Sequence, residues 1–121
     1  MQPFSYPVTV SGPFGQYSVE ALVDPQATFS SFPAAALIEL GIEPVRVVRL
    51  KSNDGRVCFR QLGRALTTVA GTEDIAPVLF GDPGERCVIG GVTLAILLLE
   101  ANPASCRIVS VDAVELGVML K

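Results

Sequence analysis

One carboxylate in this sequence follows an apolar stretch and precedes a turn of small and hydroxylic residues. Asp24 ends the stretch 19–23, and the turn after it leads into Pro33 and a helix-like segment, residues 34–40, which Gly41 ends. A strand, an acid, a turn and a helix in this order place a single carboxylate at the edge of a sheet. Asp24 is therefore the leading candidate for acid–base chemistry in this chain.

The chain contains no histidine. Ser-His and Cys-His nucleophilic chemistry is therefore excluded, and the commonest zinc ligand is missing. The groups that remain for acid–base work are carboxylates, lysines and tyrosines. The loop acids Asp74, Asp82 and Glu85 match no calcium or magnesium loop, so we interpret them as solvated side chains. We expect neither a metal ion nor any other cofactor.

Three cysteines, Cys58, Cys87 and Cys106, lie far apart in the sequence. An odd number without a close pair argues against a disulfide framework. Free cysteine is commonly a small buried hydrophobic residue, and this interpretation has more support here than a redox or metal-binding role. We therefore expect three buried thiols.

The length and the composition of the chain indicate one domain, residues 1–121, because the chain has 121 residues and half of them are hydrophobic. The formal net charge is −3 and the basic residues are scattered, which gives no indication of a nucleic-acid partner. Arg46, Arg49 and Lys51 are interpreted as strand residues that face water. The first four residues lack the features of a signal peptide.

The longest apolar run, residues 87–99, contains two glycines and is shorter than the roughly 18 residues that a membrane span needs. We therefore expect a soluble, cytoplasmic protein without a membrane partner. This run also repeats the layout around Asp24 without the acid: residues 86–89 are predicted to form a short buried strand, Gly90-Gly91 is the sharp turn out of it, and residues 92–100 are predicted to form a helix. Two such units are the main organisational signal in the chain.

Turn residues divide the rest of the chain into short β-type segments. Asn53-Asp54-Gly55 is a hairpin turn, because these residue types tolerate positive φ, and Ser30 or Ser31 is expected to cap the first helix. Many short strands between regular turns favour a barrel-like or sandwich-like β domain, here with two short helices. The predicted strands are residues 6–10, 16–23, 45–51, 57–60, 62–69, 75–80, 86–89 and 105–111, with turns at 11–15, 71–74 and 102–103 and a last segment, 114–120, that is strand or irregular.

Taken together, these motifs resemble the single-domain retroviral-type (retropepsin-like) aspartic peptidases, and among them the small bacterial and archaeal members. That family has an apolar strand that ends in Asp-Thr-Gly-Ala-Ser/Thr, a hairpin called the flap, and two apolar residues followed by Gly and a short helix. The matching residues, in order, are Ala21-Leu22-Val23-Asp24 with Ala27-Thr28, then residues 50–57, then Val88-Ile89-Gly90 with residues 92–99, and a closing strand from Asn102-Pro103 to Val109.

The resemblance, which covers residues 6–111, implies a mainly β, closed, barrel-like aspartic-peptidase domain that acts as a homodimer on peptide or protein substrates. Each subunit supplies one Asp24, and the two carboxylates share one proton because two like charges so close cannot both ionise. Thr28 and Ala27 support the catalytic turn, and Thr28 is expected to bond to Asp24. The twofold contact is expected from the apolar ends, residues 1–10 and 114–120.

The resemblance also implies roles for two further segments. Asn53, Asp54 and Gly55 form a flap over the substrate, or else an ordinary exposed turn. Val88, Ile89 and Gly90 form the floor of the substrate cleft, or else a part of the core. The residues by themselves do not separate these alternatives.

The sequence departs from the family at its centre, where Asp24-Pro25-Gln26 replaces Asp-Thr-Gly. Pro25 has neither a hydroxyl nor an N–H group, and Gln26 stands where a conformation that only glycine adopts cheaply is expected. Three hypotheses therefore remain: an active peptidase, a catalytically lapsed dimer that binds peptide or serves in assembly, and a structural subunit of a larger complex. Asp24 is correspondingly either a catalytic group or a carboxylate that accepts N–H bonds from its turn.

Overall fold

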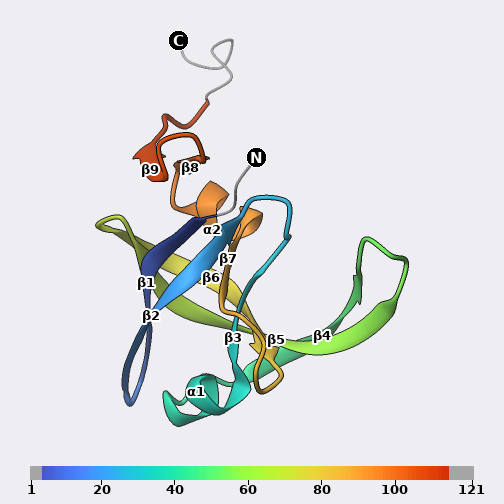
Figure 1. Cartoon of the computed structure of the whole chain (residues 1–121). Helices are drawn as coiled ribbons and strands as arrows, with labels where there is room; N and C mark the ends of the chain where they lie inside the picture. Colours follow the sequence, from blue (N-terminus) through green and yellow to red (C-terminus); the bar gives the residue numbers. More distant parts are fainter. Residues whose placement is uncertain (1–3, 115–121) are drawn as a thin grey trace, which may run out of the picture.

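The computed structural model describes residues 4–114, which form short strands and two helices (Figure 1). The described elements, in order, are β1 (Phe4–Gly12), β2 (Gly15–Asp24), β3 (Ser30–Pro33), α1 (Ala34–Glu39), β4 (Pro44–Lys51), β5 (Val57–Val69), β6 (Thr72–Gly81), β7 (Val88–Gly90), α2 (Gly91–Ile96), β8 (Leu99–Asn102) and β9 (Arg107–Ser110).

Six of the strands close into a barrel. They follow the order β1-β2-β7-β3-β6-β5, and β5 pairs back with β1, where Val8 lies opposite Val69. The seventh strand of the sheet is β4. Among the described strands it pairs only with β5, and the two extend away from the barrel as a hairpin (Figure 1). The predicted fold class, a mainly β closed barrel with two short helices, is confirmed.

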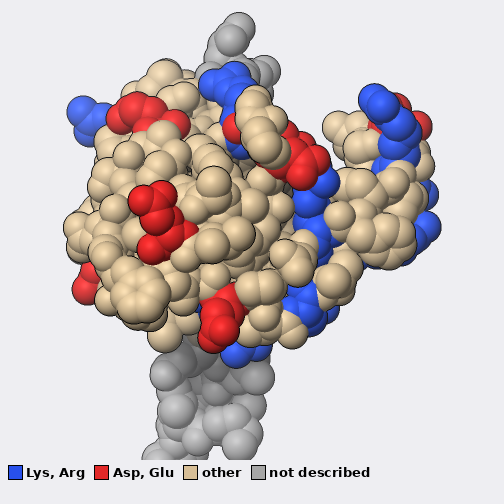
Figure 2. Space-filling view, turned by 90° about the horizontal axis from the view of Figure 1, so that it is seen from below, with Lys and Arg blue, Asp and Glu red and all other residues tan. Residues whose placement is uncertain are grey.

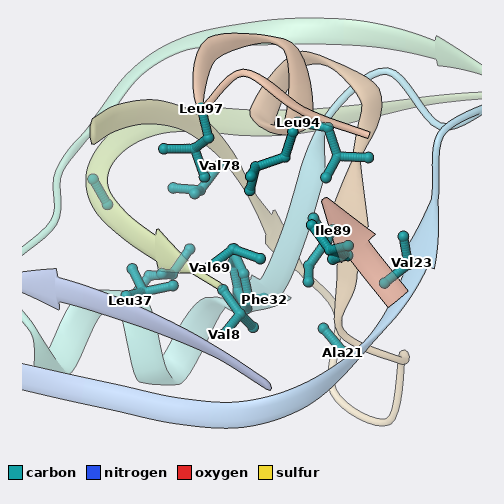
Figure 3. Close-up of a cluster of buried hydrophobic side chains, with 14 of the residues drawn as sticks. Val8, Ala21, Val23, Phe32, Leu37, Val69, Val78, Ile89, Leu94 and Leu97 are labelled. Carbon is teal, nitrogen blue, oxygen red and sulfur yellow. The ribbon is translucent and has the colours of Figure 1, made fainter. Parts of the chain in front are cut away.

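Alternating side chains of the strands fill the barrel. Val8 and Val10 of β1 and Ala21 and Val23 of β2 are all buried, while the residues between them are more exposed, as the two-residue period of a strand requires. Figure 3 shows side chains from strands far apart in the sequence converging on this core. The core is completed by Leu37 of α1, Leu94 of α2 and Leu97, the C-cap residue of α2.

Helix α1 begins after Pro33, whose φ of −57° already suits a helix. It ends at Gly41, which takes a φ of +83°; the Gly41 N–H donates to Ile38 O and the Ile42 N–H donates to Leu37 O, the Schellman arrangement. The expected cap by Ser30 or Ser31 is wrong. Both serines lie in β3, and among the described residues no side chain makes a capping hydrogen bond to this helix.

Helix α2 is shorter than predicted. It ends at Ile96, and Leu98 takes a positive φ of 55° that turns the chain into β8. Asn102 is therefore the last residue of β8 and Pro103 begins the turn to β9, so this pair is not at a helix end. The apolar run misled the prediction because a buried helix and a buried strand have similar compositions, and periodicity does not separate them over so few residues.

Two strand boundaries also differ from the prediction. The segments predicted as 57–60 and 62–69 form one continuous strand, β5, because its first half pairs with β4 and its second half with β1. The predicted turn 71–74 is only Ala70 and Gly71, both with positive φ, and Thr72 already pairs with Val69.

The expected dimer contact lies largely outside the described residues. Residues 1–3 and 115–120 are not described, and Val114 is exposed. The described part of the N-terminal segment is β1, which pairs with β2 along its whole length and with β5 from Val8 onward. No helix within residues 4–114 is long and apolar enough to cross a membrane.

Two isoleucines test the assignment of the core. Ile89 is completely buried in β7, whereas Ile75 of β6 is 59% exposed. We expect Ile89→Ala to lower the free energy of unfolding by about 2–5 kcal/mol, because it removes buried methyl groups and leaves a cavity. The matched control Ile75→Ala should cost less than about 1 kcal/mol. Urea unfolding of both variants measures this, and equal losses would contradict the burial of Ile89.

Candidate functional site

Asp24 lies at the end of β2, where it pairs with Gly90 of β7, and its side chain is half-buried. Its carboxylate Oδ1 accepts a hydrogen bond of 3.1 Å from the Gln26 backbone N–H, and its carbonyl oxygen accepts one of 3.1 Å from the Ala27 N–H. The turn after β2 thus fixes the carboxylate with its own backbone. One oxygen of that carboxylate, Oδ2, makes no hydrogen bond within the described residues.

The two strand–turn units of the sequence pack directly against each other. The Gly91 N–H donates to Ala27 O at 2.7 Å, and the Val92 N–H donates to Thr28 O at 3.0 Å. A Cβ atom on Gly90 would lie 2.5 Å from the carbonyl carbon and oxygen of Phe29, and one on Gly91 would lie 2.7 Å from Pro25 O. Both positions require glycine because the backbone of the Asp24 turn passes too close for a side chain.

A buried pair of hydroxyl groups joins the same two units. Ser30 Oγ and Thr93 Oγ1 lie 2.5 Å apart, and both residues are fully buried. Ser30 Oγ also accepts a hydrogen bond of 3.0 Å from the Gly90 N–H, beside Asp24. Sequence reasoning missed this pair, although a signal existed. Thr93 is the single hydroxyl residue in the apolar run 92–99, and a buried hydroxyl needs a partner.

The supporting residues act through their backbones. Thr28 is exposed, and its hydroxyl makes no hydrogen bond to Asp24 among the described residues, so the bond expected there is wrong. Ala27 contributes its N–H and carbonyl groups. Gln26 does not take a positive φ, so the expected glycine-only conformation is also wrong, and the turn accepts a side chain at this position.

A groove of about 980 Å³ lies between the β4–β5 hairpin and the barrel. Figure 2 shows the hairpin standing away from the body of the molecule. We call this space the hairpin groove. Its apolar lining comes from Leu50, Val57, Leu79 and Val88, and its charged lining from Lys51, Asp54, Arg56, Arg60, Glu85 and Arg86, with Ser31, Ser52, Cys58 and Gly84 between them.

The structure brings some of the predicted site residues to this groove and leaves others away from it. Val88 and Asp54 line it, and Val88 pairs with Leu22, two positions before Asp24. The lining does not include Asn53, Gly55, Ile89, Gly90 or Asp24 itself. The Ile89 side chain is buried in the core, and Gly90 serves the close approach to Phe29.

Asp54 organises the tip of the hairpin. Its carboxylate accepts hydrogen bonds from the Ser52 hydroxyl, from the Arg56 backbone N–H at 3.1 Å and from Arg56 Nε at 2.8 Å. These bonds, the one from Ser52 foremost, lower the pKa of Asp54 because they favour its charged form. Gly55 completes the turn with a φ of +86°.

An ion cluster holds the base of the hairpin. Arg60 Nη1 lies 3.0 Å from Asp82 Oδ2, and Arg60 Nη2 lies 2.8 Å from Glu85 Oε2. Glu85 Oε1 accepts a hydrogen bond of 2.7 Å from the Asp82 backbone N–H. Burial acts to lower the pKa of Arg60, but the two carboxylates outweigh it and raise that pKa. The cluster links β5 to the loop between β6 and β7.

The cysteines do not form three buried thiols. Cys58 and Cys106 are exposed, and only Cys87 is partly buried, so this prediction is wrong for two of them. Burial raises the pKa of Cys87, against the opposite effect of a hydrogen bond with Tyr17. Within the described residues, no group of three or more acidic or thiol side chains is placed to hold a metal ion.

The buried hydroxyl pair generates a stability prediction. Ser30→Ala should lower the free energy of unfolding by about 1–3 kcal/mol, because the Gly90 N–H and the Thr93 hydroxyl lose a buried partner. The control is Ser18→Ala, which breaks an exposed hydroxyl pair with Thr9 of 2.8 Å and should change stability by less than about 0.5 kcal/mol. Denaturant unfolding of the two variants measures both changes in the free energy of unfolding. A Ser30→Ala protein as stable as Ser18→Ala would contradict the role of the pair.

Thiol reactivity gives a second prediction. In a disulfide-exchange assay at about pH 8, two thiols should react quickly and Cys87 slowly, because the thiolate is the nucleophile and a raised pKa lowers its population. Cys87→Ser should remove the slow phase, and Cys106→Ser should remove half of the fast amplitude. Three equal rates would contradict the burial of Cys87.

Comparison with known proteins finds a likeness among solved structures. No protein-family model matches the chain, and no curated protein matches it. Among solved structures, the solution structure of Simian Foamy Virus (mac) protease aligns with a TM-score of 0.55 and 21% sequence identity, over 79% of this chain and 94% of that one. At this identity the likeness is one of architecture, and it shows that the chain has a retropepsin-like fold.

Proposed function

We propose that this protein is a retropepsin-like aspartic peptidase homologue that hydrolyses peptide bonds as a homodimer, with one Asp24 from each subunit. The observation that carries the proposal is the position of Asp24. Its half-buried carboxylate stands at the end of β2, fixed by the Gln26 N–H and backed by the close approach of Gly90 and Gly91.

The chemistry requires two such carboxylates. Close together they share one proton, since two negative charges at that distance repel strongly. The ionised Asp24 removes a proton from a water molecule while the oxygen of that water attacks the scissile carbonyl carbon. The protonated Asp24 of the other subunit donates its proton to the carbonyl oxygen. Collapse of the intermediate breaks the C–N bond, and the amine leaves with a proton. Because one chain supplies a single Asp24 at this turn, a second copy completes the site.

The hairpin groove supplies a place for the substrate. Leu50, Leu79 and Val88 form an apolar surface in it, and Asp54 at the tip of the hairpin also lines it. We take the hairpin as the cover of an extended peptide bound there. Neither a metal ion nor a cofactor takes part in the proposed reaction.

A second candidate is the same dimer without hydrolysis, a peptide-binding or assembly module. Pro25 favours it, because at this position the chain has neither a hydroxyl nor an N–H group to hold a pair of carboxylates. Thr28 does not compensate, since its hydroxyl is not bonded to Asp24. Both candidates use the hairpin groove, so experiments on Asp24 and on Pro25 separate them.

Substitution of the carboxylate tests the peptidase. Asp24→Asn should lower the rate of peptide cleavage by at least about 100-fold, because the amide neither takes a proton from water nor shares one. The matched control is Asp112→Asn, an exposed carboxylate away from the groove, which should cleave like the wild type. Cleavage is measured between acidic and neutral pH with a pool of labelled peptides. Equal rates for wild type and Asp24→Asn would rule out this mechanism.

Restoration of the family residues distinguishes the two candidates. The double variant Pro25→Thr with Gln26→Gly should cleave at least about 10-fold faster than the wild type, because a hydroxyl and an N–H group return beside Asp24. A wild type that binds peptide without cleaving it, together with a double variant that cleaves, supports the lapsed module. If the wild type already cleaves peptide and the double variant cleaves no faster, the lapsed module is refuted.

The mass in solution tests the dimer. Sedimentation should give twice the chain mass of 12.8 kDa at micromolar concentration. A monomer at every concentration that supports cleavage would contradict a shared Asp24 site.

A further inference from the structure

The β4–β5 hairpin carries a concentration of positive charge. Residues 46–64 hold six of the nine basic residues and a single acid, Asp54. Their formal charge is therefore +5, which leaves −8 for the rest of a chain whose net charge is −3. Figure 2 shows Lys and Arg side chains along the hairpin. The expectation that the basic residues are scattered is therefore wrong.

Only part of this charge is neutralised. Arg56 pairs with Asp54, and Arg60 pairs with Asp82 and Glu85. Six other cations make no salt bridge within residues 4–114, and they are Arg46, Arg49, Lys51, Arg64, Arg86 and Arg107.

Two of these unpaired cations line the hairpin groove from different sides. Lys51 comes from β4, and Arg86 comes from the loop between β6 and β7. Leu50, Leu79 and Val88 supply apolar surface in the same groove. A segment that lies there meets apolar side chains and uncompensated positive charge. The lining as a whole carries four cations and two carboxylates, and an excess of one sign of charge attracts ligands of the opposite sign.

The lining favours a peptide over a nucleic acid. Single-stranded nucleic acids are held by aromatic side chains on which bases stack, and none of the described lining residues is aromatic. The exposed aromatic residue of the hairpin, Phe59, is not among the lining residues.

We propose that the hairpin groove selects peptides that carry acidic side chains next to apolar ones, with Lys51 and Arg86 as the specificity-determining residues. The inference rests on the proposed function, because it takes the groove to be the peptide site. It adds the class of substrate: acidic–apolar segments in an extended conformation.

Binding is measured on the full chain with Asp24→Asn, so that no peptide is cleaved. Three fluorescein-labelled decapeptides share a Leu-Val centre and differ only in flanking Glu, Gln or Lys residues. By fluorescence anisotropy at low salt, the Glu peptide should bind about 3- to 10-fold tighter than the Gln peptide, and the Lys peptide should bind most weakly. The preference should shrink at high salt, because screening weakens exposed charge pairs.

Charge reversal assigns the preference to the two residues. Lys51→Glu with Arg86→Glu should invert the order of the Glu and Lys peptides. The matched control Arg46→Glu with Arg49→Glu changes the charge of the protein by the same amount at positions that do not line the groove, and it should retain the order. The milder pair Lys51→Gln with Arg86→Gln, which should abolish the preference, serves if the reversal impairs folding.

Three outcomes would overturn the inference: equal affinity for the three peptides, an equal loss of preference in the Arg46/Arg49 control, or a single-stranded oligonucleotide that displaces the Glu peptide more strongly than unlabelled Glu peptide does. In each of these cases peptides still bind, so the proposed function stands. If none of the three peptides binds, the assignment of the groove as a peptide site fails, and the inference fails with it.

Discussion

The candidate site depends on the close approach of two backbone segments. Gly90 and Gly91 lie against the turn that follows β2, so closely that a Cβ atom on either would reach within 2.5–2.7 Å of its backbone. This contact allows α2 to donate its first N–H groups to the carbonyls of that turn, and it places the Ser30–Thr93 pair beneath Asp24. The position of the carboxylate is thus a property of two units together. Neither unit alone would fix it.

Much of the fold could be predicted from local chemistry. Pro33 and Gly41 marked the ends of α1, and the Asn53-Asp54-Gly55 turn marked the hairpin, because each has one dominant backbone preference. The prediction failed where tertiary pairing decides. The β5 strand is continuous because different partners take over along its length, and Leu98 adopts a positive φ that no local pattern indicates.

The candidate site could be predicted only in part. The order of the motifs singled out Asp24, and the structure places it at a strand end. The functions of Ser30 and Thr93 were not predicted. Thr93 stands out as the single hydroxyl residue of an apolar run, but its partner lies 63 residues away, and no local pattern indicates which residue that is. A cleft between the 53–55 turn and residues 88–90 was expected, and Asp54 and Val88 do line the hairpin groove. The charge of the groove was missed, since Lys51 and Arg86 are 35 positions apart and line one space only when the hairpin folds beside the loop.

The hairpin is anchored in an apolar cluster of its own. Val48, Leu62 and Leu79, with Phe29 and Leu50 beside them, form a group separate from the main core. Segments with few buried contacts open at a lower free energy than the rest of a protein, in cooperative units. Backbone amides of the hairpin should accordingly exchange with deuterated solvent through local opening while the barrel stays closed. The hairpin and the groove beside it can then change shape while the barrel stays closed, so the mobility of the hairpin and the stability of the fold can vary independently.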